Sequence, residues 1–318
     1  MLEKKETIKK VGIFTEGGAG IGLGHLTRCH ALAYALREKG YSPVFFVLSA
    51  DDVTGFLRPF TVEYGDWKTD AGEIISKKQL SFAIVDSYLA SRDIYDTISR
   101  ILRGNMLIID DYMRLKYPKS LVVNPSIGSE ALEYPMGGGL RYALGKDYII
   151  LRPEFWKSGP KDIKDTIRSI LVTLGGSADK EISGRIASLI RKNTDADIRV
   201  LDSYQNRYSA LQIQDMMTAA DLAVSAGGQT MYELAKLGVP TISITLGDDQ
   251  ALIVKALQES GFSFSAGKID EDIFPDRLSK GFEYMSDKVI RKKCSISGQR
   301  SVDGEGAHRL VDIIKGAI

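Results

Sequence analysis

The chain of 318 residues lacks the features of a disulfide-stabilised, exported or membrane-spanning protein. Its two cysteines, Cys29 and Cys294, are far apart and have no C-x-x-C spacing, so we predict neither a disulfide framework nor a cysteine zinc site. No apolar run approaches the roughly 18 residues that a membrane helix needs. The first ten residues are mostly charged and contain no signal-peptide stretch. We therefore expect a cytoplasmic protein that binds no metal and does not insert into a membrane.

An excess of charge is also missing, because 42 Lys and Arg residues face 41 Asp and Glu residues. A net charge of +1 provides no global field to hold nucleic acid, so we expect no nucleic-acid partner. The contents of 44% hydrophobic and 26% charged residues are those of a globular protein with a sizeable core. At roughly 100–200 residues per domain, the length predicts two domains.

Short apolar, β-branched runs alternate with segments of helical period, which is the pattern of βαβ units in a parallel sheet. The alternation starts again after a polar break that contains Gly159 and Pro160, so we expect an α/β protein with domains over residues 1–158 and 159–302. The expected strands are Val11–Thr15, Val44–Leu48, Met106–Ile109, Ser169–Leu174, Ile198–Leu201, Leu222–Ser225 and Thr241–Thr245, and the expected helices include residues 25–39, 93–102 and 180–192.

Glycine is in excess, at 31 residues or about a tenth of the chain against a usual ~7%. The glycines cluster where strands run into helices, at residues 17–24, 175–176 and 227–228. Backbone N–H groups at such strand ends bind phosphates, so the clusters predict a phosphate-bearing ligand. The alternative is that these glycines only permit positive φ in the loops.

Two common phosphate-binding motifs are excluded by the spacing of these glycines. No register of residues 17–24 fits G-x-G-x-x-G, because the position that requires the third glycine is occupied by Leu23 or His25. Gly145-Lys146 and Gly267-Lys268 lack the other residues of a Walker A loop. We therefore expect neither a dinucleotide-binding fingerprint nor a P-loop.

His25 is placed in the first turn of its expected helix, directly after the glycine loop, with Leu26, Cys29, Ala33 and Leu36 on the buried stripe. The positive end of the helix dipole favours the neutral imidazole, which can take a proton from water. Arg28, one turn later, is placed to hold a phosphate or to orient an acid. The alternatives are a structural histidine and a solvated surface arginine.

The second half contains Thr230-x-x-Glu233 directly after Gly227-Gly228-Gln229. This spacing fits a capping box, in which Glu233 accepts from its own helix, as well as it fits a carboxylate that binds the two hydroxyls of a ribose. In the first half, Asp86, Asp110 and Asp111 end expected strands and are candidates to line the same cleft.

Several motifs in order along the chain resemble those of the UDP-2,4-diacetamido-2,4,6-trideoxy-β-L-altropyranose hydrolases of the pseudaminic acid pathway. The segment Gly22-Leu23-Gly24-His25-Leu26-Thr27-Arg28-Cys29 is similar to their G-x-GH-x-x-RC signature. The resemblance covers nearly the whole chain, and each motif alone is shared with the wider GT-B superfamily. The other matching segments are Ile84–Tyr88, Ile109–Asp111, Asn124, Tyr142–Leu144, Leu151–Phe155, Leu174–Ser177, Ala226–Glu233 and Asp303–Ala307.

The resemblance implies a GT-B fold, with two Rossmann-like domains facing across a cleft and a C-terminal helix, residues 303–318, that packs back on the first domain. It implies a UDP-sugar substrate, a monomer without cofactor, and His25 as the base that activates water for attack at the anomeric carbon. Helix N-termini and cationic side chains then stabilise the leaving diphosphate without a metal. The implied nucleotide-binding residues are Gly175, Gly176, Ser177, Gly227, Gly228, Gln229, Thr230 and Glu233; the implied substrate-binding residues are Gly24, Arg28, Tyr88, Asn124, Asp249 and Gln250.

One departure from the family pattern concerns the substrate. Asp249-Gln250 stands where the hydrolases have Asn-Gln. An ionised Asp only accepts hydrogen bonds, whereas Asn also donates, so contacts to the sugar or phosphate there must differ. A related hydrolase for another nucleotide-linked diacetamido sugar, a GT-B glycosyltransferase with a UDP-sugar donor and a non-catalytic nucleotide-sugar binder remain open alternatives.

Overall fold

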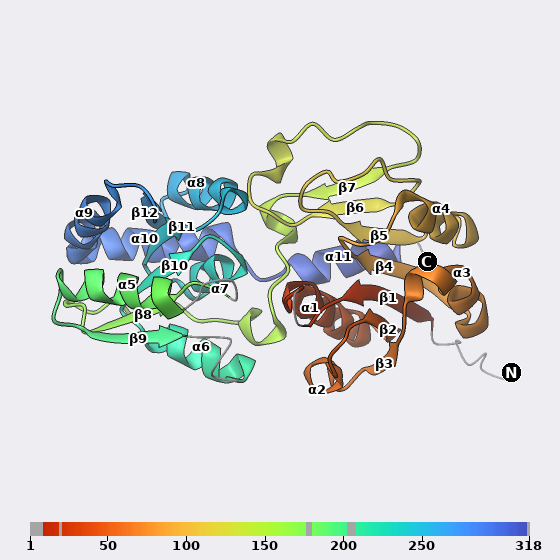
Figure 1. Ribbon diagram of the computed structural model, residues 1–318, viewed down its shortest axis with the longest axis horizontal. Helices are drawn as coiled ribbons and strands as arrows, with labels where there is room; N and C mark the ends of the chain where they lie inside the picture. Colours follow the sequence, from red (N-terminus) through yellow and green to blue (C-terminus); the bar gives the residue numbers. More distant parts are fainter. Residues whose placement is uncertain (1–8, 19–20, 176–179, 202–207, 317–318) are drawn as a thin grey trace, which may run out of the picture. The chain divides into compact units, whose positions relative to one another are not determined.

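A computed structural model describes residues 9–18, 21–175, 180–201 and 208–316, and within these ranges all side chains except those of Lys180 and Asp249. The chain forms two compact units (Figure 1). Unit 1 comprises Met1–Arg152 and Glu305–Ile318, and unit 2 comprises Pro153–Gly304. The polar segment around Gly159, where the sequence placed the boundary, therefore belongs to unit 2.

Unit 1 is built on a parallel sheet of seven strands in the order β3-β2-β1-β4-β5-β6-β7. The order reverses direction between β1 and β4, which makes this pair the switch point of the sheet. The strands are β1 (Lys10–Glu16), β2 (Ser42–Leu48), β3 (Thr61–Tyr64), β4 (Leu80–Asp86), β5 (Met106–Ile109), β6 (Leu121–Asn124) and β7 (Arg141–Leu144).

The helices of unit 1 bury apolar stripes against this sheet and against each other. α3 and α4 pack together and contribute Trp67, Ile75 and Ile98 to a core with one face of the sheet. α1 packs on β1 and β2 and against the C-terminal helix α11. The stripe expected on α1 is confirmed, because Leu26, Cys29, Ala33 and Leu36 are fully buried. The helices are α1 (Gly24–Glu38), α2 (Thr54–Leu57), α3 (Trp67–Lys78), α4 (Arg92–Ile101) and α11 (Gly306–Lys315).

Unit 2 repeats the architecture with a parallel sheet of five strands in the order β12-β11-β10-β8-β9. Its switch point lies between β8 and β10. The strands are β8 (Ser169–Thr173), β9 (Asp197–Leu201), β10 (Leu222–Ala226), β11 (Thr241–Thr245) and β12 (Ser263–Lys268). The helices are α5 (Lys180–Arg191), α6 (Ala210–Ala219), α7 (Gln229–Leu237), α8 (Ala251–Glu259), α9 (Phe274–Ser286) and α10 (Lys288–Ser301).

The α/β class and the strands and helices predicted from the sequence are confirmed. In both units the residues that follow the strands gather at the carboxyl edge of the sheet, because parallel strands end on the same side. Those glycines of the three clusters that the structure describes lie at this edge and beside the switch points. No helix in the described part of the chain has the length and apolar content that a bilayer crossing requires.

Candidate active site

His25 and Asp86 form a buried hydrogen-bonded pair beside the switch point of unit 1. His25 is the second residue of α1 and only 5% exposed, and its Nδ1 lies 2.6 Å from Asp86 Oδ1. Asp86 is the last residue of β4 and is fully buried. An ionised carboxylate only accepts hydrogen bonds, so Nδ1 carries the ring proton of neutral His25. The lone pair of the imidazole is therefore on Nε2.

Arg28 keeps Asp86 ionised. Burial alone would raise the pKa of Asp86, but the charges of Arg28 and His25 and their hydrogen bonds lower this pKa to about 2. Arg28 Nε lies 2.6 Å from Oδ2 and its Nη2 lies 2.7 Å from Oδ1, so both carboxylate oxygens are held. At neutral pH Asp86 is thus an anion that stabilises the imidazolium formed when His25 Nε2 takes a proton.

The guanidinium of Arg28 also bridges to a second carboxylate. Its Nη1 donates to both oxygens of Asp111, at 3.0 Å and 2.8 Å. The Arg28 side chain is 15% exposed, and burial lowers its pKa less than Asp111 and Asp86 raise it. The sequence offered two roles for Arg28, holding a phosphate or orienting an acid, and the structure places its charge on the two acids.

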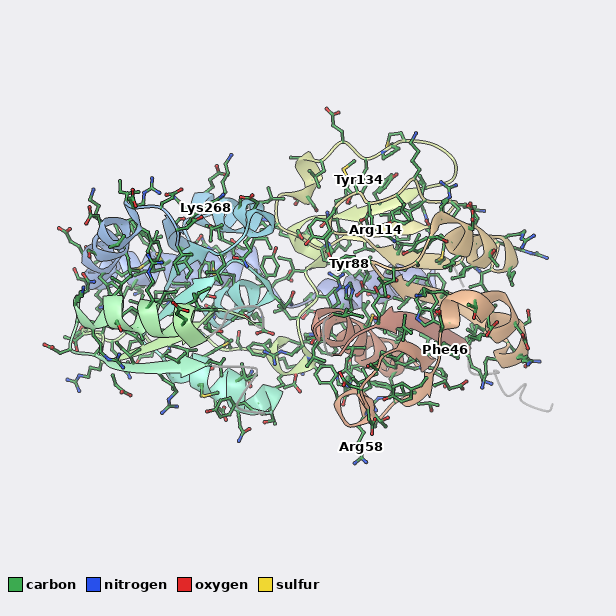
Figure 2. All side chains as sticks on the ribbon, viewed as in Figure 1. Phe46, Arg58, Tyr88, Arg114, Tyr134 and Lys268 are labelled. Carbon is green, nitrogen blue, oxygen red and sulfur yellow. The ribbon has the colours of Figure 1, made fainter. Side chains whose placement is uncertain are left out.

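Tyr88 lies on the loop after β4 with its ring edge against the His25 ring, at 4.4 Å between centroids and an interplanar angle of 80°. Its hydroxyl donates to Asp111 Oδ2 at 2.9 Å. The residue is 42% exposed, so it is partly open to solvent. Its side chain is labelled in Figure 2. The structure thus brings three of the candidate site residues together: His25, Arg28 and Tyr88.

Two other sequence candidates in unit 1 lie differently. Asn124 is fully buried, and its Nδ2 donates to the Asp111 carbonyl at 3.2 Å and to the Tyr134 hydroxyl at 3.0 Å. Its Oδ1 accepts from the Ser126 N–H at 3.1 Å. The Asn124 amide therefore helps to hold the Asp111 loop in place. Gly24 starts α1, and no atom lies within 4 Å of the position that a Cβ would take there.

The sequence analysis did not single out Glu16, the last residue of β1. Glu16 is fully buried, and its Oε1 accepts from the backbone N–H groups of Tyr88 at 2.6 Å and Leu89 at 3.2 Å. It therefore fixes the backbone of the loop that carries Tyr88. The sequence feature that could have identified Glu16 is a charged residue at the end of an otherwise apolar central strand. A carboxylate buried there requires hydrogen-bond partners.

In unit 2 the candidate nucleotide residues lie at the carboxyl ends of β8 and β10. Gly175 follows β8 with a φ of +77°, which glycine adopts without strain. Gly227 and Gly228 follow β10, and α7 begins at Gln229 with no side-chain cap. Gly228 has no side chain with which to cap the first N–H groups of α7. Gly176, Ser177 and the side chain of Asp249 lie outside the described part of the chain.

The capping box that the sequence offered as one of two explanations for Thr230 and Glu233 does not form. Gly228 takes the N-cap position in an extended conformation, so Thr230 is the second residue of α7 rather than its cap. Glu233 lies in the helix and is 2% exposed. A capping box with Thr230 at the N-cap therefore does not describe the start of this helix.

Gln250 shapes the loop beside the α7 terminus. Its Oε1 accepts from the Leu246 N–H at 3.0 Å, which folds the segment after β11. A Cβ on Gly227 would lie 2.6 Å from Val254 Cγ2 and 3.0 Å from the Gln250 carbonyl oxygen. This loop and the α7 terminus are therefore in direct contact and require glycine at position 227.

Gly227→Ala should accordingly lower the free energy of unfolding by about 1–3 kcal/mol, because the new methyl meets backbone and a packed valine. Gly228→Ala is the matched control. Its φ of −173° suits any residue, and nothing lies within 4 Å of the added Cβ. We expect this control to change the free energy of unfolding by less than about 0.5 kcal/mol. Urea unfolding of both variants checks the expectation, and equal losses would contradict the packing.

The chain is similar in sequence to several known proteins. No protein-family model matches it. The spore coat polysaccharide biosynthesis protein SpsG of Bacillus subtilis is 26% identical over 96% of this chain and 97% of its own length. A Helicobacter pylori protein named pseudaminic acid cytidylyltransferase and UDP-2,4-diacetamido-2,4,6-trideoxy-β-L-altropyranose hydrolase is 24% identical over 76% of this chain and 45% of its own length.

Solved structures show the fold. MurG of Acinetobacter baumannii superposes with a TM-score of 0.69 at 14% identity, covering 96% of this chain and 99% of its own. The calicheamicin glycosyltransferase CalG4 superposes with a TM-score of 0.63 at 11% identity, covering 98% of this chain and 100% of the CalG4 chain. The chain has the GT-B fold. The sequence prediction of this fold is confirmed.

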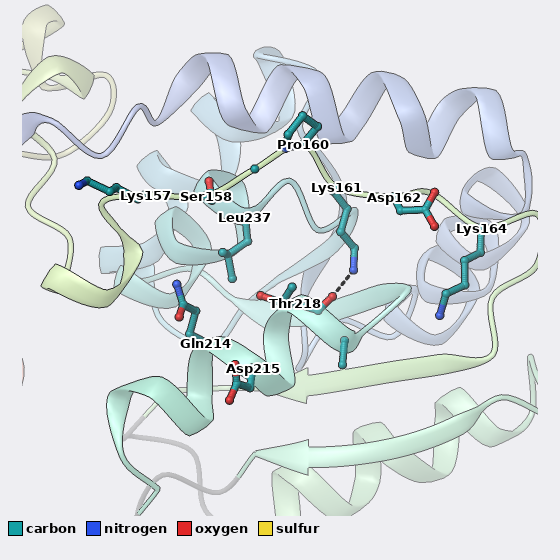
Figure 3. A pocket seen from close by; sticks show the side chains of 12 residues that line it. Lys157, Ser158, Pro160, Lys161, Asp162, Lys164, Gln214, Asp215, Thr218 and Leu237 are labelled. Atoms are coloured by element: carbon teal, nitrogen blue, oxygen red, sulfur yellow. Dashed lines mark hydrogen bonds between the residues drawn. The ribbon is translucent and has the colours of Figure 1, made fainter.

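A cavity of about 470 Å³ in unit 2 of this GT-B chain contains none of the predicted site residues. Its lining comes from the segment 157–164, from α6 and from the end of α7 (Figure 3). Burial lowers the pKa of Lys161, which donates to the Thr218 carbonyl, and Lys164 pairs with Asp221 at 3.2 Å. This cavity is therefore separate from the glycine loops of the candidate nucleotide site.

Proposed function

We propose that this GT-B protein hydrolyses a UDP-linked 2,4-diacetamido-2,4,6-trideoxyhexose to the free sugar and UDP, as part of pseudaminic or related nonulosonic acid synthesis. The observation that carries the proposal is the His25–Asp86 pair, which leaves an unprotonated Nε2 at the carboxyl edge of the sheet. The Helicobacter pylori relative, whose name includes this hydrolase activity, supports the substrate class.

The reaction begins with a water molecule that donates a hydrogen bond to His25 Nε2. Its oxygen attacks the anomeric carbon while its proton passes to Nε2, and the bond from that carbon to the diphosphate oxygen breaks. The bonding electrons leave with UDP, so one water is consumed for each sugar and UDP released. The Asp86 anion stabilises the imidazolium during this step, because it lies 2.6 Å from Nδ1.

Unit 2 is proposed to hold the UDP portion of the substrate. The positive end of α7 and the glycine backbone after β8 and β10 suit a diphosphate, and Glu233 is proposed to accept from the ribose hydroxyls. The proposed nucleotide residues are Gly175, Gly176, Ser177, Gly227, Gly228, Gln229, Thr230 and Glu233. Gly24, Tyr88, Asp249 and Gln250 remain the proposed contacts to the rest of the substrate.

The second candidate is a GT-B glycosyltransferase, in which His25 deprotonates an acceptor hydroxyl instead of water. The structural similarity to MurG and CalG4 favours this alternative. The likeness to a spore coat polysaccharide biosynthesis protein is compatible with either reaction and with a different nucleotide-linked sugar.

Incubation of the purified protein with UDP-linked and GDP-linked diacetamido sugars, without any acceptor, tests the proposal. We expect UDP and free sugar to form in equal amounts from the UDP-linked diacetamido substrate. Intact substrate after long incubation would contradict hydrolysis. Release that starts only when an acceptor is added would establish the transferase, and stable substrate binding without either reaction would indicate a binding protein.

A further inference from the structure

We propose that Asp111 is a positioning residue that fixes the direction of the Tyr88 hydroxyl, so that the Tyr88 oxygen faces its ligand as a hydrogen-bond acceptor. The inference rests on the proposed function for its effect on turnover. The hydrogen-bond direction itself can be tested without substrate.

The hydroxyl proton of Tyr88 already has an acceptor, the carboxylate of Asp111. The hydroxyl lies 2.9 Å from Asp111 Oδ2, and a carboxylate has no hydrogen to offer in return. A phenol has one proton and two lone pairs, so donation to Asp111 leaves Tyr88 only its acceptor capacity. A group that meets the exposed side of this oxygen must therefore be a hydrogen-bond donor.

Asp111 is itself held on two sides. Arg28 Nη1 donates to both of its carboxylate oxygens, and the Asn124 amide donates to its backbone carbonyl at 3.2 Å. Arg28 in turn is fixed by the fully buried Asp86. The acceptor that faces Tyr88 consequently has a set position and charge.

Tyr88 is restrained at its other end as well. Glu16 Oε1 accepts from the Tyr88 backbone N–H at 2.6 Å, and the ring lies edge-on to His25. A hydroxyl on a side chain fixed at backbone and ring has little freedom to turn away from Asp111. The direction of its proton is thus a property of the folded protein.

The consequence is a pair of acceptors on adjoining rings. His25 Nε2 and the Tyr88 oxygen both present lone pairs, so the two groups select O–H or N–H donors. A sugar hydroxyl, an acetamido N–H and the attacking water all satisfy this requirement, whereas a carbonyl or phosphate oxygen does not. Asp111 would thereby exclude phosphate from this position and reserve it for the sugar or for water.

A double-mutant cycle tests whether Asp111 acts through the Tyr88 hydroxyl. Asp111→Asn still accepts from Arg28 through its carbonyl, but its amide can donate to the Tyr88 oxygen and reverse the hydroxyl. We expect Asp111→Asn and Tyr88→Phe each to lower kcat about tenfold. The double variant should stay within about twofold of Tyr88→Phe alone. An equal loss from Asp111→Asn in both backgrounds would overturn the proposal, because Asp111 would then act only through Arg28 and Asp86.

Asp96→Asn is the matched control for the loss of one negative charge from unit 1. Asp96 is paired on the surface with Arg92 at 3.0 Å and its side chain is 46% exposed. We expect this variant to keep the kcat of the unmodified protein. A tenfold loss in this control would show that the assay responds to charge alone, which would overturn the assignment to Asp111.

Carbon NMR of the full chain labelled at tyrosine Cζ tests the hydrogen bond without substrate. The Tyr88 signal among the 14 tyrosines is the one that Tyr88→Phe removes. Burial and Asp111 raise the pKa of Tyr88, while Arg28 opposes them and Tyr112 adds to the rise; His25 also faces the ring. Tyr88 is therefore un-ionised at neutral pH, where we expect its Cζ signal to move in Asp111→Asn because the neighbouring acceptor is replaced by an amide that can donate. An unchanged signal would overturn the hydrogen-bond assignment.

The two measurements separate the two proposals. If the unmodified protein releases no UDP, the proposed hydrolysis fails while the Tyr88 NMR signal still decides the role of Asp111. If UDP is released but the Tyr88 signal is the same in Asp111→Asn, hydrolysis stands and the role of Asp111 is refuted.

Discussion

His25→Asn should lower kcat for UDP release by roughly 10²–10⁴-fold, the usual range for loss of a general base. Asparagine cannot take the proton of the attacking water, and no other imidazole in the described structure reaches this position: His30 bonds to the Arg58 carbonyl, and His308 pairs with Glu38. The affinity for UDP should change by less than about twofold, because the proposed UDP contacts come from unit 2. Single-turnover kinetics and calorimetric titration with UDP measure the two quantities.

His30→Asn is the matched control, since it makes the same substitution five residues further along α1. Its ring packs against Tyr34 and Phe60, away from Asp86. We expect this control to retain kcat. Full turnover in His25→Asn would show that the base is another group.

Asp86→Asn should have an effect of similar size for a different reason. An amide at this position can donate to Nδ1, which favours the tautomer with the proton on Nε2 and removes the acceptor for water. In a comparable acid–imidazole pair, such a change lowers kcat on the order of 10⁴-fold. Unchanged kcat in a folded Asp86→Asn protein would contradict the assigned tautomer.

Stability provides an independent measure of the same substitution. Removing one partner of a buried ion pair typically costs about 3–5 kcal/mol, and Arg28 would keep only Asp111 as a charged partner. Urea unfolding at neutral pH measures this loss. The surface variant Asp96→Asn should lose less than about 1 kcal/mol.

The pH dependence of stability follows from the same carboxylate. The pKa of Asp86 is about 2 in the folded chain against an ordinary value of 3.8, so the folded state binds this proton more weakly. Its contribution, about 2 kcal/mol, is therefore complete above pH 3.8 and is lost as the pH falls through about 2. The free energy of unfolding should decline more steeply over this interval in the unmodified chain than in Asp86→Asn.

The sequence predicted the fold well because its strongest elements are local. β1, β10 and β11 are buried apolar runs between turn residues, and α1 carries a regular apolar stripe. β3, β7 and β12 were not predicted. β3 and β7 are short, partly exposed edge strands, and β12 contains Ser and Gly residues of low strand propensity, so all three depend on pairing with a neighbouring strand.

The site could be predicted only in part, because its contacts join residues far apart in the chain. Arg28 reaches Asp86 and Asp111 across separations of 58 and 83 residues, which only the parallel register of β1, β4 and β5 brings together. The sequence named Asp110 and Asp111 together. In the structure Asp110 accepts from the Arg114 N–H of its own loop, and only Asp111 turns to Arg28.

In unit 2 the sequence prediction was limited by an ambiguous local pattern at the start of α7. Thr230 and Glu233 have the spacing of a capping box, and local propensity alone does not decide where the helix begins. Gly228 decides it by taking the N-cap position in extended conformation. The spacing of Thr230 and Glu233 is therefore weaker evidence of where α7 begins than the preceding Gly228.

The most direct test of the account is the reaction in H₂¹⁸O with the UDP-linked diacetamido sugar and no acceptor, followed by mass spectrometry of the released UDP. Water activated by His25 attacks the anomeric carbon, so UDP keeps its original β-phosphate oxygens and carries no ¹⁸O. UDP that contains ¹⁸O would place the attack at phosphorus, and the absence of UDP without an acceptor would show that water is not the nucleophile.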